Sequence, residues 1–289
     1  MTSINFAKVA NGDVSITANT SMNFSRGISS HACFFVAAPP DRVAELLASW
    51  NPQAHPELDV YEHRFFRGAA DAAFESLRLP DKLPPVRQLL KAMKSRDDLQ
   101  LSRAELTQIP QNPTSETAQQ FWVATLRNRW TGFTKSGLKA AALQEPFDAE
   151  SEFKSLVAEE PKVAKHFAKL LAETPLTLSA AGQPVAHYWD VSNVSNVATL
   201  SLGAIYRQEL QLADFEYFVG GNYVIALTLS EVVPAEIGGK AGALVWQGNY
   251  VSSNQLTGGF GWKRKLAAHA IESDTVKTIR FFQRDAAAR

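Results

Sequence analysis

The first strongly patterned stretch of the chain lies within residues 30–37. Its run from His31 to Val36 is apolar on both alternating faces, which predicts a strand that is central in a sheet or covered on both sides. Two prolines end that strand at positions 39 and 40. A short helix is then predicted from Asp41, because one apolar stripe follows at helical spacing: Val43, Leu46, Leu47 and Trp50.

A second strand is predicted over residues 57–66, where apolar and polar positions alternate. Alternate residues of a strand share a face, so the polar positions in and just before this segment would line up on one side of it. Those positions are His55, Glu57, Asp59, Tyr61 and His63.

From Asp71 to about Thr174 the apolar positions follow helical rather than strand spacing. Pro84 and Pro85 begin one predicted helix, and Thr114 caps a longer one. The apolar stripes of these two helices contain Val86, Leu89, Leu90 and Met93, and Phe121, Trp122, Leu126 and Trp130. We therefore predict a helical insertion at about 70–175 within a single α+β domain that spans residues 1–289.

After Pro184 the period returns to two. Strands rich in β-branched and aromatic residues are predicted over 185–191, 198–207, 215–219, 223–233 and 242–252. Gly220-Gly221 predicts a tight hairpin between two of them, and Gly238-Gly239 a looser turn. The chain closes with a long predicted helix from Trp262 to about Arg284, whose stripe is Ile271, Thr275, Ile279 and Phe282.

The composition is that of an ordinary globular protein of 289 residues, with 45% hydrophobic and 20% charged residues. Lysine and arginine together number 29, as do aspartate and glutamate, so no global field would attract nucleic acid or an anionic membrane. Cys33 is the single cysteine, which excludes an intramolecular disulfide and a cysteine-based zinc site. Packing must therefore hold the fold together.

No stretch of the sequence approaches the roughly 20 apolar residues that a transmembrane helix needs. Residues 1–5 lack the basic and apolar regions of a signal peptide. We therefore expect a soluble protein with no transmembrane segment. The Asn/Thr/Ser-rich opening through Ser25 is typical of many exported proteins, so a cytoplasmic location and export with a removed signal peptide both stay open, as does the oligomeric state.

Sequence signatures of common enzyme classes are absent: there is no Gly-x-Ser-x-Gly elbow, HExxH helix or phosphate-binding loop. We predict no catalytic residue and no cofactor from sequence. The polar face from His55 to His63 contains metal-binding residue types, but same-face neighbours on a strand lie about 7 Å apart. We interpret it as a polar strand face and predict no metal site.

The most distinctive local composition is the glycine-rich and basic segment before the last predicted helix. Glycines let backbone amides approach a ligand, and cations at a helix N-terminus would reinforce the binding of an anion. The candidate anion-binding residues are Gly258, Gly259, Gly261, Lys263 and Arg264, with Lys265 next in sequence. The alternative is a hinge between strand and helix whose charges are solvated.

The order of these predicted elements resembles that of the helix-grip superfamily, which includes START domains and birch-pollen-allergen-like proteins. Residues 34–43, Phe-Phe-Val-Ala-Ala-Pro-Pro-Asp-Arg-Val, are similar to that superfamily's first strand, proline break and first helix. A long helix after Leu244-Val245-Trp246 matches its ending. The similarity covers about 150 of the 289 residues, and the helical block is far larger than the usual connection. The superfamily has no invariant catalytic motif to transfer.

This resemblance implies a curved antiparallel sheet that grips the C-terminal helix around an apolar cavity. Many members bind lipids, sterols or polyketide-like molecules, so the expected function is that of a soluble binding or carrier protein for an apolar, lipid-like small molecule. Side chains or a ligand must fill the volume between such a sheet and its helix. The candidate ligand-binding residues are Phe215, Tyr217, Tyr223, Trp246, Tyr250, Ile279 and Phe282, with ordinary core packing as the alternative for each aromatic residue.

Two other functions remain open at this point. An enzyme acting on a hydrophobic small molecule in the same cavity would need two or more titratable groups that converge inside it, whereas a carrier predicts an apolar wall with one polar anchor. A protein–protein interaction module built on the helical block would show a large exposed apolar patch.

Overall fold

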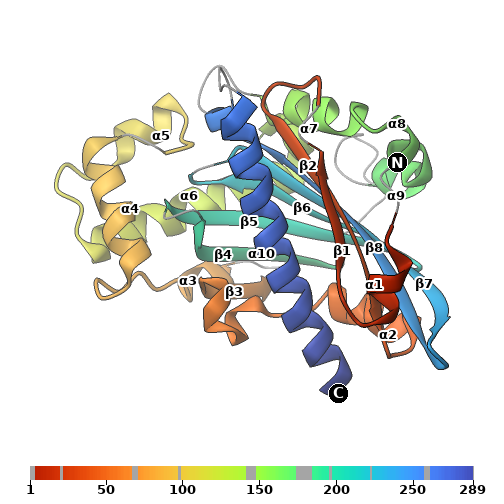
Figure 1. The fold of residues 1–289 in the computed structure, drawn as a ribbon. Coiled ribbons are helices and arrows are strands. Elements are labelled where there is room, and N and C mark those ends of the chain that lie inside the picture. Colours follow the sequence, from red (N-terminus) through yellow and green to blue (C-terminus); the bar gives the residue numbers. More distant parts are fainter. Residues whose placement is uncertain are drawn as a thin grey trace.

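We describe the protein from a computed structural model. The structure describes residues 4–19, 22–66, 71–96, 99–140, 148–173, 184–194, 197–221, 223–256 and 261–288. The fold combines one large antiparallel sheet with helices on both of its faces (Figure 1). The predicted α+β class, with an antiparallel sheet, a long C-terminal helix and a helical block, is therefore confirmed.

Eight strands form one antiparallel sheet in the order β1-β2-β8-β7-β6-β5-β4-β3. All of the strands expected from the sequence share this sheet, including β2 and β3, which lie on either side of α2 (Pro40–Leu47) in the chain. Strand β1 was not expected, because its sequence is polar; it pairs with β2 from Ser15↔Cys33 to Asn19↔Ser29. The strands are β1 (Ser15–Asn19), β2 (Gly27–Val36), β3 (Val60–Phe66), β4 (Ala186–Val194), β5 (Val197–Gln208), β6 (Gln211–Val219), β7 (Ile225–Ile237) and β8 (Lys240–Ser252).

Helices cover the two faces of the sheet unequally. The longest helix, α10, crosses one face, which we call the cavity face, together with the short helix α2 (Figure 1). The helical block packs on the opposite face, which we call the block face. The helices are α1 (Phe6–Ala10), α2 (Pro40–Leu47), α3 (Asp71–Glu75), α4 (Pro84–Ser95), α5 (Arg103–Gln108), α6 (Ser115–Ser136), α7 (Ala149–Ala158), α8 (Pro161–His166), α9 (Ala168–Glu173) and α10 (Gly261–Ala288).

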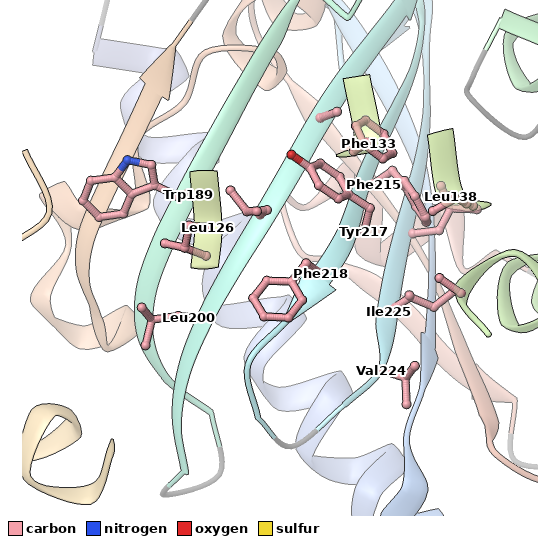
Figure 2. Packing of buried hydrophobic residues seen from close by; sticks show 14 of the residues in the cluster. Leu126, Phe133, Leu138, Trp189, Leu200, Phe215, Tyr217, Phe218, Val224 and Ile225 are labelled. Carbon is pink, nitrogen blue, oxygen red and sulfur yellow. The ribbon is translucent and has the colours of Figure 1, made fainter. Parts of the chain in front are cut away.

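The largest apolar core lies between the block face and the helical block. Figure 2 shows side chains of α6 and the segment after it lying against strand residues of β4 to β7. The rings of Phe133 and Tyr217 stack with centroids 3.6 Å apart, and Phe153 meets Phe215 edge-on at 4.9 Å. Such aromatic pairs add about 0.5–1.5 kcal/mol beyond their buried area. The block and the sheet therefore share one continuous core.

A second core lies on the cavity face, where α10 and α2 meet the sheet. Phe282 of α10 packs edge-on against Phe34 of β2 and against Trp50, with ring centroids 6.2 and 5.9 Å apart. Ile279, one turn earlier on α10, is only 2% exposed and belongs to the same cluster. The apolar stripe expected on the last helix thus supplies the contacts that hold α10 on the sheet.

The tight hairpin turn lies at Gly238-Gly239, where a looser turn was predicted, and the looser connection lies at Gly220-Gly221, where a tight hairpin was predicted. Gly238 and Gly239 form the two-residue turn between β7 and β8, with Ile237 paired to Lys240. Both glycines have positive φ angles, +61° and +76°, as a type I′ hairpin requires. Gly220-Gly221 instead begins a longer connection, because β6 ends at Val219 and β7 begins at Ile225. The prediction of a tight hairpin at Gly220-Gly221 was therefore wrong.

The predicted polar strand face from His55 to His63 is shorter than expected. Prolines at positions 52 and 56 begin two short 3₁₀ turns, Pro52–Ala54 and Pro56–Leu58, so β3 begins only at Val60. Asp59, between the second turn and β3, adopts a left-handed conformation with φ of 54°. His63 remains on the strand, but it is buried under α10 rather than exposed to solvent.

The helical block offers no exposed apolar patch among the described residues. The large hydrophobic side chains that are exposed among the described residues, Phe6, Val233 and Leu266, all lie outside α3–α9. The described part of the block therefore lacks the large exposed apolar patch that a protein–protein interaction module would show.

Among all the described residues, no helix is both long enough and apolar enough to span a bilayer.

We expect Cys33 to react slowly with thiol reagents. Its side chain is 1% exposed on β2, and burial raises the pKa of the thiol to about 11, so very little reactive thiolate is present at neutral pH. Labelling the native protein with a chromogenic disulfide reagent should be far slower than labelling the urea-unfolded chain. Equal rates in the two states would contradict this burial.

Candidate functional site

A cavity of about 690 Å³ lies between the cavity face of the sheet and α10. Its described lining comes from β2 to β8, from α10, from the end of α2 and the segment between α2 and β3, and from Tyr223 before β7. No residue of α3–α9 contributes to it. The final helix, and not the helical block, therefore forms the wall opposite the sheet.

On the central strands, fully buried residues alternate with partly exposed residues, and the partly exposed ones face the cavity. On β6, Ala213, Phe215 and Tyr217 point to the block face and are fully buried, while Asp214 and Glu216 between them keep accessible surface. The neighbouring strand β7 shows the same contrast, with Ala226 and Thr228 half-buried. These strands lie in the middle of the sheet, so the surface that these side chains expose faces the cavity.

Two carboxyl groups of β6 lie on the floor of the cavity, each paired with a tyrosine. The hydroxyl of Tyr188 on β4 donates to Asp214 Oδ1 at 2.8 Å. The hydroxyl of Tyr223 donates to Glu216 Oε2 at 2.5 Å. Since Asp214 and Glu216 are two residues apart on one strand, their side chains project from the same face of the sheet.

A third carboxyl group, Asp190 on β4, joins this floor with a histidine partner. Its Oδ1 atom lies 2.5 Å from His63 Nδ1, and Ser201 Oγ lies 3.5 Å from its other oxygen. The His63 side chain is 5% exposed and packs edge-on against the ring of Phe65. Its second nitrogen, Nε2, is buried and has no hydrogen-bond partner.

Burial changes the ionisation of these groups. The pKa of Glu216 is raised to about 8 and that of Asp214 to about 6, mainly by burial. The charge of Asp190 contributes to both increases, whereas the tyrosine hydroxyls, and His63 in the case of Asp214, oppose them. Burial also raises the pKa of both tyrosines, so their hydroxyls stay protonated. At neutral pH Glu216 therefore holds its proton for most of the time, and Asp214 has mostly lost its own.

The absence of a side chain at Gly203 makes room for Tyr188. Gly203 on β5 pairs with Tyr188 on one side and with Glu216 on the other. A Cβ atom at position 203 would lie 2.1 Å from Tyr188 Cζ and 2.4 Å from its hydroxyl oxygen. Only glycine therefore lets the ring lie flat over β5 and carry its hydroxyl to Asp214.

Neutral polar groups extend the floor across β7 and β8. Asn249 is their centre, because its Oδ1 accepts from Thr228 at 3.0 Å and from Gln247 at 2.8 Å, and its Nδ2 donates to Ser30 at 3.2 Å. These groups satisfy one another and hold no charge. They separate the carboxyl groups of β4 and β6 from strand β2.

Apolar side chains form the rest of the wall. They come from the sheet, from α10, and from the end of α2 and the segment after it, and they include Phe34, Leu47, Trp50, Phe65, Ile205, Leu212, Ile271, Ile279 and Phe282. Trp50 is fixed in place by a hydrogen bond from its Nε1 to Asp285 Oδ2 at 2.8 Å. The cavity thus has an apolar wall and a polar, acidic floor, and is suited to a molecule with both kinds of surface.

The predicted ligand-binding residues are divided between the two faces of the sheet. Tyr223, Ile279 and Phe282 line the cavity. Phe215, Tyr217 and Tyr250 are buried in the core under the helical block, and Trp246 packs against that core. The structure therefore brings three of the seven together at the cavity and assigns the other four to ordinary core packing.

The predicted anion-binding segment lies largely outside the described residues, which include neither Gly258 and Gly259 nor the side chain of Lys263. Gly261 begins α10. Arg264 donates from its two terminal nitrogens to the backbone carbonyls of Ser25 and Gly27, at 3.2 and 2.7 Å. This arginine thus fastens the start of α10 to the chain just before β2.

The polar residues considered for a metal take separate partners. His55 contacts Asp285 at 2.8 Å and stacks on Phe281, whereas His63 is held by Asp190. Among the described residues, no group of three or more histidine, cysteine, aspartate or glutamate side chains is arranged to hold a metal ion.

The acidic floor was not predicted from sequence, although one signal for it exists. Asp214 and Glu216 alternate with Ala213, Phe215 and Tyr217 in a strand whose other face is aromatic, a pattern that normally marks a solvated face. The sequence does not reveal that α10 covers that face. Asp190 and His63 belong to strands 127 residues apart, so no local pattern connects them.

Comparisons with models of known protein families and with curated proteins find no match to this chain, so its function has to be inferred from the chemistry of the cavity.

Proposed function

We propose that this protein encloses a small amphipathic molecule in the cavity between the sheet and α10. The observation that carries the proposal is the cavity itself: it measures about 690 Å³, and its apolar wall faces a floor containing Asp190, Asp214 and Glu216. Ligand sites usually occupy roughly 300–1,000 Å³ and combine apolar lining with a few convergent polar groups. The apolar wall would hold the body of the molecule and the floor its polar head.

The strand–helix–strand beginning and the final helix across the sheet support the resemblance to the helix-grip superfamily. That resemblance implies the binding of lipid-like molecules. The acidic floor adds a requirement that an entirely apolar ligand does not meet, because burying ionisable groups against hydrocarbon is costly. We therefore extend the expected carrier function to ligands with a polar head group.

We expect a bulky residue at position 226 to block binding. Ala226 is half-buried on β7 and faces the cavity, so the indole of Ala226→Trp would occupy ligand space. Binding of the neutral fluorescent probe N-phenyl-1-naphthylamine should weaken at least tenfold. The matched control is Ala241→Trp, at an exposed position on β8, which should bind the probe as the wild type does.

Thermal unfolding of both variants separates blocked binding from misfolding. Native mass spectrometry of the purified protein adds a second readout, because an enclosed molecule would appear as an additional mass that Ala226→Trp lacks. If Ala226→Trp stays folded and binds the probe with unchanged affinity, the cavity is not the binding site and the proposal fails.

An enzyme acting on the enclosed molecule is the second candidate, favoured by the separated pKa values on the floor. Glu216, with a pKa of about 8, holds a proton at neutral pH, whereas Asp214, with a pKa of about 6, has mostly released its own. Adjacent acidic groups in opposite protonation states can serve as general acid and general base. Conversion of a bound molecule that stops in Glu216→Gln would favour this candidate, and an unchanged mass would favour the carrier.

A further inference from the structure

We propose that the polar head group taken by this cavity is a cationic amine, held between the carboxyl groups of Asp214 and Glu216. This inference rests on the proposed binding function and names the class of ligand. Its first support is the charge of the lining. Six described lining residues carry carboxyl groups and one is a lysine, with no arginine among them: Glu57, Asp59, Asp190, Asp214, Glu216 and Asp274, against Lys277.

The lysine does not neutralise the floor. Lys277 lies on α10 and donates its ammonium to the backbone carbonyl of Glu57, at the edge of the cavity. The imidazole of His63 is committed to Asp190. Among the described residues, no cationic side chain forms an ion pair with Asp214 or Glu216, and each accepts a hydrogen bond from a tyrosine hydroxyl instead. A positively charged ligand would supply the cationic partner that these two carboxyl groups lack among the described residues.

The floor is also short of hydrogen-bond donors. When both carboxyl groups are ionised, above about pH 8, Asp214 and Glu216 present four acceptor oxygens, whereas the hydroxyls of Tyr188 and Tyr223 supply one proton each. A primary ammonium supplies three N–H donors, which can pair with the remaining oxygens. Charge-assisted bonds of this kind are shorter and about twice as strong as neutral ones.

An independent observation is the unpartnered nitrogen of His63. Its Nδ1 atom pairs with a carboxylate oxygen of Asp190, whereas its Nε2 atom has no hydrogen-bond partner. This atom belongs to a cavity-lining side chain that is 5% exposed, and no protein group pairs with it. Buried polar atoms are nearly always paired, so an unpaired ring nitrogen on a side chain that lines the cavity points to a polar ligand group as its partner.

Other head groups fit less well. An anion would meet six carboxyl groups, and a metal ion finds no set of three described ligands in suitable positions. A neutral alcohol could bind if the carboxyl groups were protonated. The alcohol and the amine therefore differ in how their binding depends on pH, because only the amine favours the ionised carboxylates.

The direction of that dependence follows from the raised pKa values. Glu216 and Asp214 titrate near pH 8 and pH 6 in the free protein, so a bound cation would lower both values and release protons. Amine affinity should rise as the pH increases from 6 to 8.5, and alcohol affinity should stay level or fall. The other titratable groups facing the floor are His63 on β3, Tyr188 and Asp190 on β4, Tyr223 before β7, Glu57 and Asp59 before β3, and Asp274 and Lys277 on α10.

The test compares three ten-carbon probes that differ only in head group: decylamine, decan-1-ol and decanoate. Displacement of N-phenyl-1-naphthylamine gives their affinities at pH 6, 7 and 8.5, where the amine stays protonated because alkylamines titrate near lysine's pKa of about 10.4. Calorimetry in two buffers of different ionisation enthalpy measures the protons released. We expect decylamine to bind at least tenfold more tightly than decan-1-ol at pH 8.5, and its binding at pH 7, where Glu216 is still mostly protonated, to release protons.

The variants Asp214→Asn and Glu216→Gln keep the shape of the floor and remove its charge. Each should weaken decylamine at least tenfold at pH 8.5 and change decan-1-ol by less than threefold. Glu236→Gln, at an exposed position of β7 away from the cavity, is the matched control and should leave all three probes unchanged. Retained binding of N-phenyl-1-naphthylamine by each variant shows that it is folded.

The outcomes distinguish failure of the amine inference from failure of the proposed binding function. If decan-1-ol binds as tightly as decylamine, if no proton is released, or if the two variants leave the amine unaffected, the head group is not an amine while the binding function stands. If the reporter and all three probes fail to bind the wild type, the proposed function fails and this inference fails with it.

Discussion

Replacing Gly203 by alanine should lower the free energy of unfolding by roughly 1–3 kcal/mol, the usual cost of forcing extra volume into a packed core. The added Cβ would lie 2.1–2.4 Å from the ring and hydroxyl of Tyr188, which is 4% exposed, so the ring would have to move. Moving the ring also breaks its hydrogen bond to Asp214. A buried carboxyl group would then lose its donor, which adds to the cost.

A double-mutant cycle tests the cause of that loss. In a Tyr188→Leu background the ring and hydroxyl are gone, so Gly203→Ala should cost much less there than in the wild type, with a coupling of roughly 0.5–3 kcal/mol. Urea denaturation of the four proteins measures it. Strictly additive losses would show that Gly203 is needed for a reason other than the space occupied by Tyr188.

Replacing Ile279 by alanine should cost about 2–5 kcal/mol, the range found when a large aliphatic side chain is removed from a core. Ile279 is 2% exposed at the contact between α10 and the sheet. The matched control is Leu266→Ala on the same helix, where the side chain is 60% exposed, and its cost should stay below about 0.5 kcal/mol. Denaturant midpoints compare the two variants directly.

Truncation before Lys263 extends the same test to the whole helix. It removes Ile279 and Phe282 and opens the cavity to solvent, so we expect the loss of a large part of a total stability that is typically about 5–15 kcal/mol. A midpoint near that of the wild type, for both Ile279→Ala and the truncation, would mean that α10 is peripheral to the fold.

Local pattern was sufficient to predict the main elements of the fold. The apolar run of β2, the alternating strands after Pro184 and the helical stripe of α10 are each set by side-chain period, which depends on neighbouring residues alone. The order of these elements then favoured one antiparallel sheet with a helix across it. Strand β1 escaped prediction because it is polar and gains its structure by pairing with the edge of β2.

The candidate site depended on tertiary structure to a much greater degree. A period of two shows that a strand has two different faces, but it does not show which layer covers each one. The aromatic residues Phe215, Tyr217 and Tyr250 were therefore expected at a ligand, whereas the helical block buries them on the opposite face. Asp214 and Glu216, on what looked like a solvated face, lie instead beneath α10.

Sequence by itself thus determined the main strands and helices and which of their positions are apolar, and it predicted a sheet covered by the last helix. Only the tertiary structure decided that His63 and Asp190, 127 residues apart, would meet in the same cavity as two tyrosine-paired carboxyl groups. Side-chain period is a local property that each segment carries with it. Convergence of charge depends on the strand order β6-β5-β4-β3 and on the layer that α10 adds, and both arise only when distant segments pack together.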